Sequence, residues 1–324
     1  MLSRIAESLY WLGRYVERAD DTARILDVYV HQLLEGALVD EDLACRSLLA
    51  TMGATPPAAG RALDVRWVTE RLAYDEAGTC SIAASLAAAR TNARGVAEAI
   101  SSELWEALNS TYNALPAQVA QGRAGGPSSF FRFVRERSAV IAGLAEHTMS
   151  HDDAWRFLVI GRSLERVDML SRLLTTGLEV LDDEQVEWVV LLRSCSAHEA
   201  YLRTYRREVE PALAAQFLVL DRLFPRSILR ALTEAERCLG ELDPSPSRAG
   251  VTDEARREVG RVRTDLEYGD PALLVGDLGA QLRVVQRACS AASAALAERY
   301  FRSGAAVVWS GGEPVASDRA GVAP

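Results

Sequence analysis

The sequence predicts an all-α protein, folded as a single pseudo-symmetric helical bundle made of two duplicated multi-helix units. Three observations support this prediction. Apolar residues recur with a period near 3.6 through nearly all of the chain. Alanine, leucine, arginine and glutamate, which all favour helices, dominate it, and no alternating strand-like run is bounded by turn residues. One pattern of charged residues also occurs twice, once in each half.

The helix boundaries follow from breaks in the periodicity and from turn signals. Prolines and glycines at 56–57, 125–127, 243–246 and 269–271 stand between periodic segments, where they end or start helices. The predicted helices cover about 3–35, 40–52, 64–74, 79–100, 102–121, 128–148, 152–181, 184–207, 209–221, 225–242, 252–268 and 271–302. The periodicity is lost after Arg302, so we expect residues 303–324 to form a flexible C-terminal tail.

The repeated pattern is the most informative feature of the sequence. Residues 10–26 read YWLGRYVERADDTARIL and residues 158–174 read LVIGRSLERVDMLSRLL, which share G-R-x-x-E-R-x-D-x-x-x-R without a gap. The matched pairs are Gly13/Gly161, Arg14/Arg162, Glu17/Glu165, Arg18/Arg166, Asp20/Asp168 and Arg24/Arg172. A weaker match relates Asp75 and Ser81 to Asp221 and Ser227. We therefore predict one helical domain over 1–302 with internal repeats at about 1–147 and 148–302.

On a helix, the repeated residues form a charged strip over three turns. In the second copy apolar residues lie on both sides of this strip, whereas a surface helix would present one broad polar face. The strip is thus expected to point into the bundle, where its charges need partners. The two strips are expected to face each other, and Gly13 and Gly161 would let another helix or a ligand approach.

Three roles are open for the strips. The ion pairs could only stabilise the helices and dock the two halves. The arginines could instead bind a carboxylate or phosphate, because guanidinium groups suit bidentate recognition of such groups. In a third possibility, Glu17 or Glu165 is the general base of an enzyme. The candidate ligand-binding residues are Arg14, Arg18, Asp20, Arg24, Arg162, Arg166, Asp168 and Arg172.

A second polar cluster, at Arg90, Asn92 and Arg94, joins Trp105 and Asn109 in the next predicted helix. Asparagine is a poor helix former, so its presence inside a helix suggests a specific hydrogen bond. The cluster either makes buried hydrogen bonds or lines the same cleft as the strips, and its first three members are further candidate ligand-binding residues.

Composition argues against several classes of function. The net charge of −9 disfavours nucleic acids and anionic membranes as partners, and no apolar run is long enough to span a membrane. All basic residues are arginine, so a phosphate-loop lysine and a Schiff-base lysine are both excluded. None of the four histidines has the spacing of a carboxylate metal site, and we expect neither a metal nor a cofactor. Five scattered cysteines and Glu7 in the N-terminal segment, where a signal peptide is apolar, lead us to expect a cytoplasmic protein.

Five segments of the chain resemble those of a known family. The segments LYWLGRYVERA at 9–19, ARTNAR at 89–94, SELWEALN at 102–109, WRFLVIGRSLER at 155–166 and FPRS at 224–227 are similar to those of the bacterial alpha-E proteins. The resemblance covers about residues 1–302, and it implies an all-helical domain whose Glu-Arg motif corresponds here to Glu17-Arg18 and Glu165-Arg166. One departure is Gly95-Val96, where family members often carry a further arginine.

The resemblance also implies a biological setting. Alpha-E proteins typically occur beside, or fused to, a circularly permuted ATP-grasp protein, often with transglutaminase-like and proteasome-like hydrolases. These neighbours imply ATP-dependent amide-bond formation on a peptide or amino acid. We therefore expect an accessory or substrate-binding subunit of an ATP-grasp-dependent peptide or amide ligase, with a charged Glu/Arg cleft between the repeats. A stand-alone enzyme and a purely structural scaffold are the alternatives.

Overall fold

The computed structural model describes residues 3–34, 40–57, 62–180, 188–243 and 248–301, and within these ranges every regular element is a helix. The prediction of an all-α protein is confirmed. The tail expected at 303–324 lies outside the described residues. None of the described helices combines the length and the apolar character that crossing a membrane requires.

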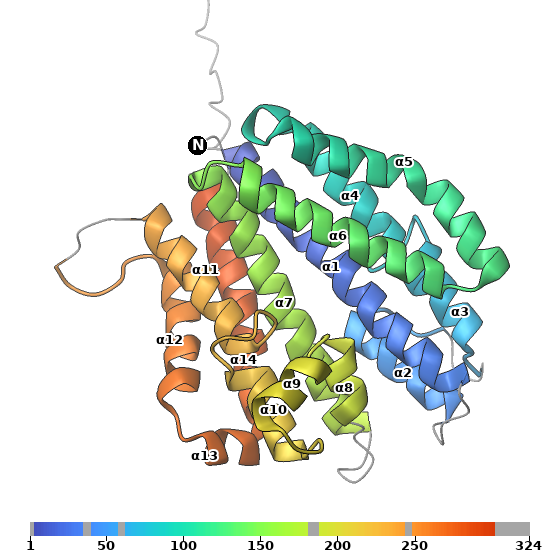
Figure 1. The fold of residues 1–324 in the computed structure, drawn as a ribbon. Coiled ribbons are helices and arrows are strands. Elements are labelled where there is room, and N and C mark those ends of the chain that lie inside the picture. The colour runs from blue at the N-terminus through green and yellow to red at the C-terminus, as the bar shows by residue number, and fades with distance from the viewer. Residues whose placement is uncertain (1–2, 35–39, 58–61, 181–187, 244–247, 302–324) are drawn as a thin grey trace, which may run out of the picture.

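Figure 1 shows the helices in the order in which they follow along the chain. The first half of the chain contains α1 (Ser3–Leu34), α2 (Glu41–Met52), α3 (Val65–Thr69), α4 (Ile82–Arg94), α5 (Ser102–Gly125) and α6 (Ser128–Thr148). The second half contains α7 (Asp153–Val180), α8 (Trp188–Ser194), α9 (His198–Tyr205), α10 (Pro211–Leu220), α11 (Ile228–Leu242), α12 (Glu254–Tyr268), α13 (Pro271–Gly276) and α14 (Leu278–Leu296).

Three of the predicted helices are shorter or interrupted. The helix expected over 79–100 ends at Arg94 and is followed by a short 3-10 turn. The one expected over 184–207 is divided into α8 and α9 because Ser196 adopts a positive φ of 51°, which no α-helix accommodates. The one expected over 271–302 is divided at Asp277, where α13 ends.

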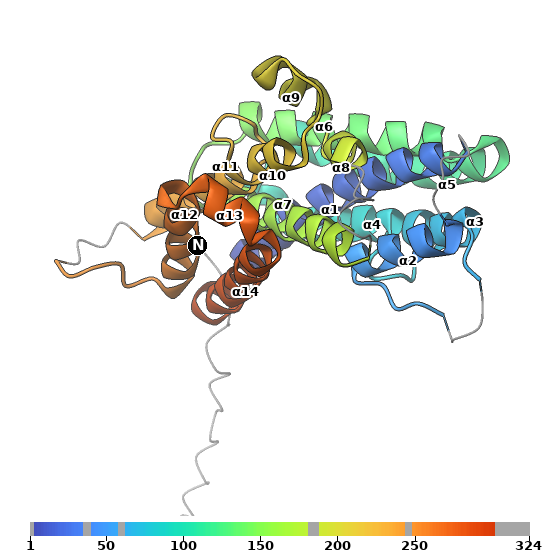
Figure 2. The ribbon, with the colours of Figure 1, turned by 90° about the horizontal axis from the view of Figure 1, so that it is seen from below.

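The two longest helices, α1 and α7, cross at the centre of the molecule (Figures 1 and 2). Helices α4 and α6 pack against α1, and α5 packs against both of them. In the second half α11 and α14 pack against α7, and α12 packs against both of those. The two halves thus have the same order of packing. The duplication itself stays a prediction.

The two halves also share one capping interaction. Ser81 and Ser227 are the N-caps of α4 and α11, and each accepts a hydrogen bond from a backbone N–H of the first turn. Each serine hydroxyl also donates to the backbone carbonyl of the aspartate six residues earlier, Asp75 or Asp221. The match between these two segments in the sequence therefore corresponds to the same local geometry.

Candidate functional site

Helices α1 and α7 cross in direct backbone contact at the two glycines of the repeated pattern. A Cβ atom placed on Gly13 would lie 2.1 Å from the carbonyl oxygen of Leu158, and one on Gly161 would lie 2.0 Å from the carbonyl oxygen of Tyr10. No side chain fits at either position. The glycines therefore bring together the charged strips that follow them on each helix.

Each strip is paired with the other across this crossing. Arg18 donates from Nε to Glu165 at 2.6 Å, and Arg14 also contacts Glu165 through its Nε. In the opposite direction Arg166 donates two hydrogen bonds to Glu17, at 2.6 and 2.9 Å. This exchange confirms that the strips face each other inside the bundle, where both glutamates are buried.

The Glu165 side of the crossing is satisfied within the protein. Arg14, besides its contact with Glu165, donates from Nη1 to the Tyr10 hydroxyl at 2.8 Å and to the Ser293 hydroxyl at 3.2 Å. Its Nη2 lies 3.8 Å from Asp168, which is also paired with Arg172. This half of the network fixes how α1, α7 and α14 pack.

The Glu17 side contains an arginine that lies outside the repeated pattern. Arg226, just before the N-cap of α11, is partly buried and contacts three carboxylates of α1. Its Nη1 lies 2.5 Å from Asp21 and 3.3 Å from Glu17, and its Nη2 contacts Asp20, which Arg24 also pairs. Only the position of Arg226 in the segment FPRS hinted at this role.

The three carboxylates that surround Arg226 have the arrangement of a possible cation site, because one oxygen from each of Glu17, Asp20 and Asp21 lies within 4.8 Å of the others. The guanidinium of Arg226 already supplies the positive charge there. A metal ion would have to displace Arg226, so this arrangement does not favour a metal site.

Asp21 titrates unusually in this cluster. Its burial, together with the negative charge of Glu17, raises its pKa to about 8, against the charge of Arg226. Asp21 consequently holds a proton at neutral pH, whereas Glu17 stays ionised.

This raised pKa predicts a pH dependence of stability. Between the ordinary aspartate pKa near 4 and pH 8, folded Asp21 keeps a proton that the unfolded chain releases, so its contribution to the free energy of unfolding falls as the pH rises. We expect Asp21→Asn, which cannot ionise, to gain roughly 3–4 kcal/mol over the wild type between pH 5 and pH 8. Urea unfolding of both proteins at the two pH values measures this. If the difference in free energy of unfolding between the two proteins stays constant or shrinks from pH 5 to pH 8, Arg226 keeps Asp21 ionised.

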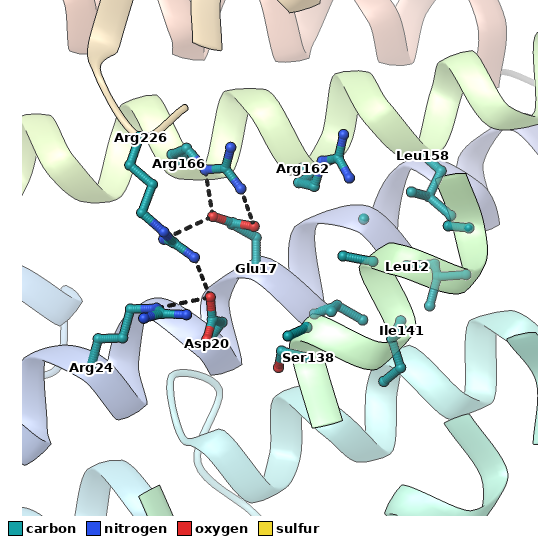
Figure 3. Close-up of a pocket in the computed structure, with 15 residues that line it drawn as sticks. Leu12, Glu17, Asp20, Arg24, Ser138, Ile141, Leu158, Arg162, Arg166 and Arg226 are labelled. Atoms are coloured by element: carbon teal, nitrogen blue, oxygen red, sulfur yellow. Dashed lines mark hydrogen bonds and ion pairs between the residues drawn. The ribbon is translucent and has the colours of Figure 1, made fainter. Parts of the chain in front are cut away.

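Arg162 differs from its counterpart Arg14, because it makes no hydrogen bond or ion pair to any described residue, and its buried Nε has no partner. Burial and the positive charge of Arg166 lower its pKa. It lies on the wall of a cavity of about 130 Å³ between α1, α6 and α7 (Figure 3). Leu158 stands at the position of Tyr10 in the repeated pattern and has no hydroxyl to offer Arg162.

The same cavity is lined by Glu17 and its partner Arg166. It is also lined by Arg24 and Arg226, which both pair with Asp20. Its polar wall consists of Glu17, Asp20, Arg24, Arg162, Arg166 and Arg226, together with Ser138. Aliphatic side chains of α1, α6 and α7 form the rest of the wall (Figure 3). Of the predicted site residues, Arg14, Arg18, Glu165, Asp168 and Arg172 do not line it.

Neither glutamate has the titration behaviour of a general base. Burial tends to raise the pKa of Glu17, but the charges of Arg166 and Arg226 outweigh it and hold the pKa at about 2. Arg14 and Arg18 likewise lower the pKa of Glu165. A catalytic base works best with a pKa near the working pH, so this geometry favours ion pairing over proton transfer. The catalytic role of both residues stays a prediction that no observation supports.

The second predicted cluster lies apart from the cavity, on α4 and α5. Arg90 donates to the side chain of Asn109 at 3.2 Å and stacks over Trp105, while Asn92 donates to the backbone carbonyl of Ala88. Arg94 is exposed. Local hydrogen bonds therefore account for these asparagines, and none of the cluster lines the cavity of Arg162.

Comparison with known proteins places this site in a family. An uncharacterized protein of Mycobacterium bovis and one of Mycobacterium tuberculosis (strain H37Rv) are each 25% identical over 295 residues, which is 83% of this chain but 32% of theirs. The chain thus spans about a third of the length of the curated relatives it matches. No solved structure matches it. Residues 1–301 match the Alpha-E family model, described as a predicted alpha-helical domain with a conserved ER motif. The Glu-Arg pairs that cross between α1 and α7 are those of the two ER sequences, and the chain belongs to the Alpha-E family.

Proposed function

We propose that this chain is the substrate-binding subunit of a cytoplasmic, ATP-grasp-dependent peptide or amide ligase, and that the cavity at Arg162 holds a carboxylate of the substrate. One observation carries the proposal. Of two arginines at the same position of the repeated pattern, Arg14 is fully paired, whereas Arg162 has no partner among the described residues and lines a cavity.

An unpaired arginine in such a place has an energetic cost, because it loses hydration without gaining a counter-ion. A carboxylate would supply the missing charge and accept hydrogen bonds from the guanidinium. The aliphatic remainder of the wall suits a ligand with an apolar part. The partner and the reaction class rest on the family resemblance; the cavity supports only the binding of the ligand.

The scaffold alternative also has an observation in its favour. The ion pairs around Glu165 are complete, and they leave no group free to bind a ligand. We assign this half of the network to docking of the two halves, and the half around Arg162 to ligand binding. The enzyme alternative has no comparable support, because both glutamates have lowered pKa values.

A matched pair of variants tests the proposal. Arg162→Met keeps the aliphatic part of the side chain and removes an unpaired charge, so the free energy of unfolding is expected to change by less than about 1 kcal/mol or to rise. Arg14→Met leaves Glu165 with one partner fewer and is expected to cost roughly 3 kcal/mol. Urea unfolding of both variants measures this contrast.

The functional measurement uses the same two variants, each co-purified with the ATP-grasp protein. We expect Arg162→Met to bind this partner but to lose ADP release on addition of candidate amino acids or peptides. Arg14→Met is expected to retain that release under conditions in which it is folded. If Arg162→Met turns over like the wild type, the cavity is not the substrate site. A wild-type chain that neither binds the ATP-grasp protein nor changes its turnover would contradict the proposed partnership.

A further inference from the structure

Three buried polar atoms without a hydrogen-bond partner lie on residues that line the cavity at Arg162. They are Nε of Arg162, Oδ1 of Asp20 and the hydroxyl of Ser138. They come from three different helices, α7, α1 and α6. Buried polar groups in folded proteins are nearly always paired, so three such atoms around one cavity indicate where the polar groups of a ligand would bind.

The types of atom define what this ligand offers. The guanidinium of Arg162 is only a donor and calls for an acceptor, for which a carboxylate is best suited. The carboxylate oxygen of Asp20 is only an acceptor, so the ligand needs an N–H or O–H donor as well. The Ser138 hydroxyl can donate to a second oxygen of the ligand. Between these groups the wall is aliphatic, with Leu12 and Ile141 among its residues.

The charge around the cavity decides what kind of donor fits. Four guanidinium groups, of Arg24, Arg162, Arg166 and Arg226, stand against three carboxylates, of Glu17, Asp20 and Asp21. The residues that line the cavity therefore carry an excess of positive charge, and Glu146 and Glu234 act on Arg162 only from outside the cavity wall. A ligand of net charge −1 balances this excess, whereas a zwitterionic amino acid would leave it uncompensated and would bring an ammonium group close to Arg24 and Arg226.

We propose that the cavity recognises an N-acylated amino acid, such as the carboxyl-terminal residue of a peptide: its carboxylate pairs with Arg162, its amide N–H donates to Asp20, and its apolar side chain packs on the aliphatic wall. The inference rests on the proposed function, which requires only a carboxylate at Arg162. It adds that the neighbouring amide is recognised too. The free amino acid is then a poor ligand of this cavity.

Calorimetric titration of the full chain with four probes of the same side chain tests this. N-acetyl-leucine carries both groups, 4-methylpentanoate lacks the amide, leucine has an ammonium group in place of the amide, and N-acetyl-leucine amide lacks the carboxylate. We expect N-acetyl-leucine to bind about tenfold tighter than 4-methylpentanoate and leucine, the effect of one hydrogen bond to a charged group. The amide is expected not to bind. The tripeptide Ala-Ala-Leu shows whether the end of a peptide binds in addition to a capped amino acid. Both carry a carboxylate beside an amide N–H, so binding of either supports recognition of these two groups.

Two variants connect the binding to the atoms. Arg162→Met is expected to abolish binding of every probe. Ser138→Ala is expected to weaken N-acetyl-leucine severalfold while leaving the protein at least as stable to urea, because the hydroxyl has no partner within the protein and alanine is the better helix former. The serine variant avoids Asp20, whose other oxygen holds Arg24 and Arg226 in place.

The outcomes separate the two proposals. Equal, Arg162-dependent binding of N-acetyl-leucine and 4-methylpentanoate would overturn the recognition of the amide and leave the carboxylate site intact. Tighter binding of leucine would place an ammonium group at Asp20 and would also overturn it. If no carboxylate binds in a manner that depends on Arg162, this inference and the proposed site both fail.

Discussion

Replacing Gly161 by alanine is expected to destabilise the protein by about 3 kcal/mol or more, although alanine is the better helix former. The added Cβ would overlap the carbonyl oxygen of Tyr10, which is backbone and cannot turn away as a side chain could. Helices α1 and α7 would have to move apart, and the ion pairs that cross between them would lengthen. Gly13→Ala, whose Cβ would overlap the carbonyl oxygen of Leu158, should behave alike.

The control for this prediction lies on α6. Gly143 is also inside a helix, but no atom lies within 4 Å of the place where its Cβ would be. Gly143→Ala is therefore expected to stabilise the protein by up to about 1 kcal/mol, the ordinary gain in helix propensity. Urea unfolding of the three variants gives the comparison. A Gly161→Ala protein that is as stable as the Gly143→Ala protein would show that α1 and α7 are not in backbone contact at Gly161.

The sequence was enough to predict the centre of this fold. Apolar residues on both sides of the second strip indicated that its charges point inward, and Glu165 is indeed fully buried. The paired glycines indicated a close approach, and α1 and α7 cross there. Both inferences depend on the periodicity of one helix, which a sequence displays directly.

The features that give the site its asymmetry could not be predicted in this way. Arg226 reaches Glu17 from a loop more than 200 positions away in the chain, and Ser293 reaches Arg14 from α14. In the repeated pattern Arg14 and Arg162 are equivalent. Arg14 pairs with Glu165 and also donates to Tyr10 and Ser293. The equivalent carboxylate, that of Glu17, is held by Arg166 and Arg226 and forms no ion pair with Arg162. Long-range packing therefore decides which of two identical motifs is left free.

Removing the buried charge of Glu165 is the second large effect that we expect. Glu165→Gln leaves Arg14 and Arg18 side by side with no carboxylate between them, in a place where water cannot compensate for it. Breaking a buried ion pair on one side in this manner costs roughly 3–5 kcal/mol.

The matched control is Glu70→Gln, which removes an equally direct contact with an arginine, Arg123, on the surface. Both of these side chains are about half exposed, so solvent screening limits the loss to about 1 kcal/mol. Urea unfolding at pH 7 measures the two variants against the wild type. Equal losses would mean that the network around Glu165 is as well hydrated as a surface pair. A large loss for Glu165→Gln alone, with N-acetyl-leucine still bound at Arg162 in the folded protein, would assign the two ER sequences to different tasks, one to holding the central helices together and the other to binding a ligand.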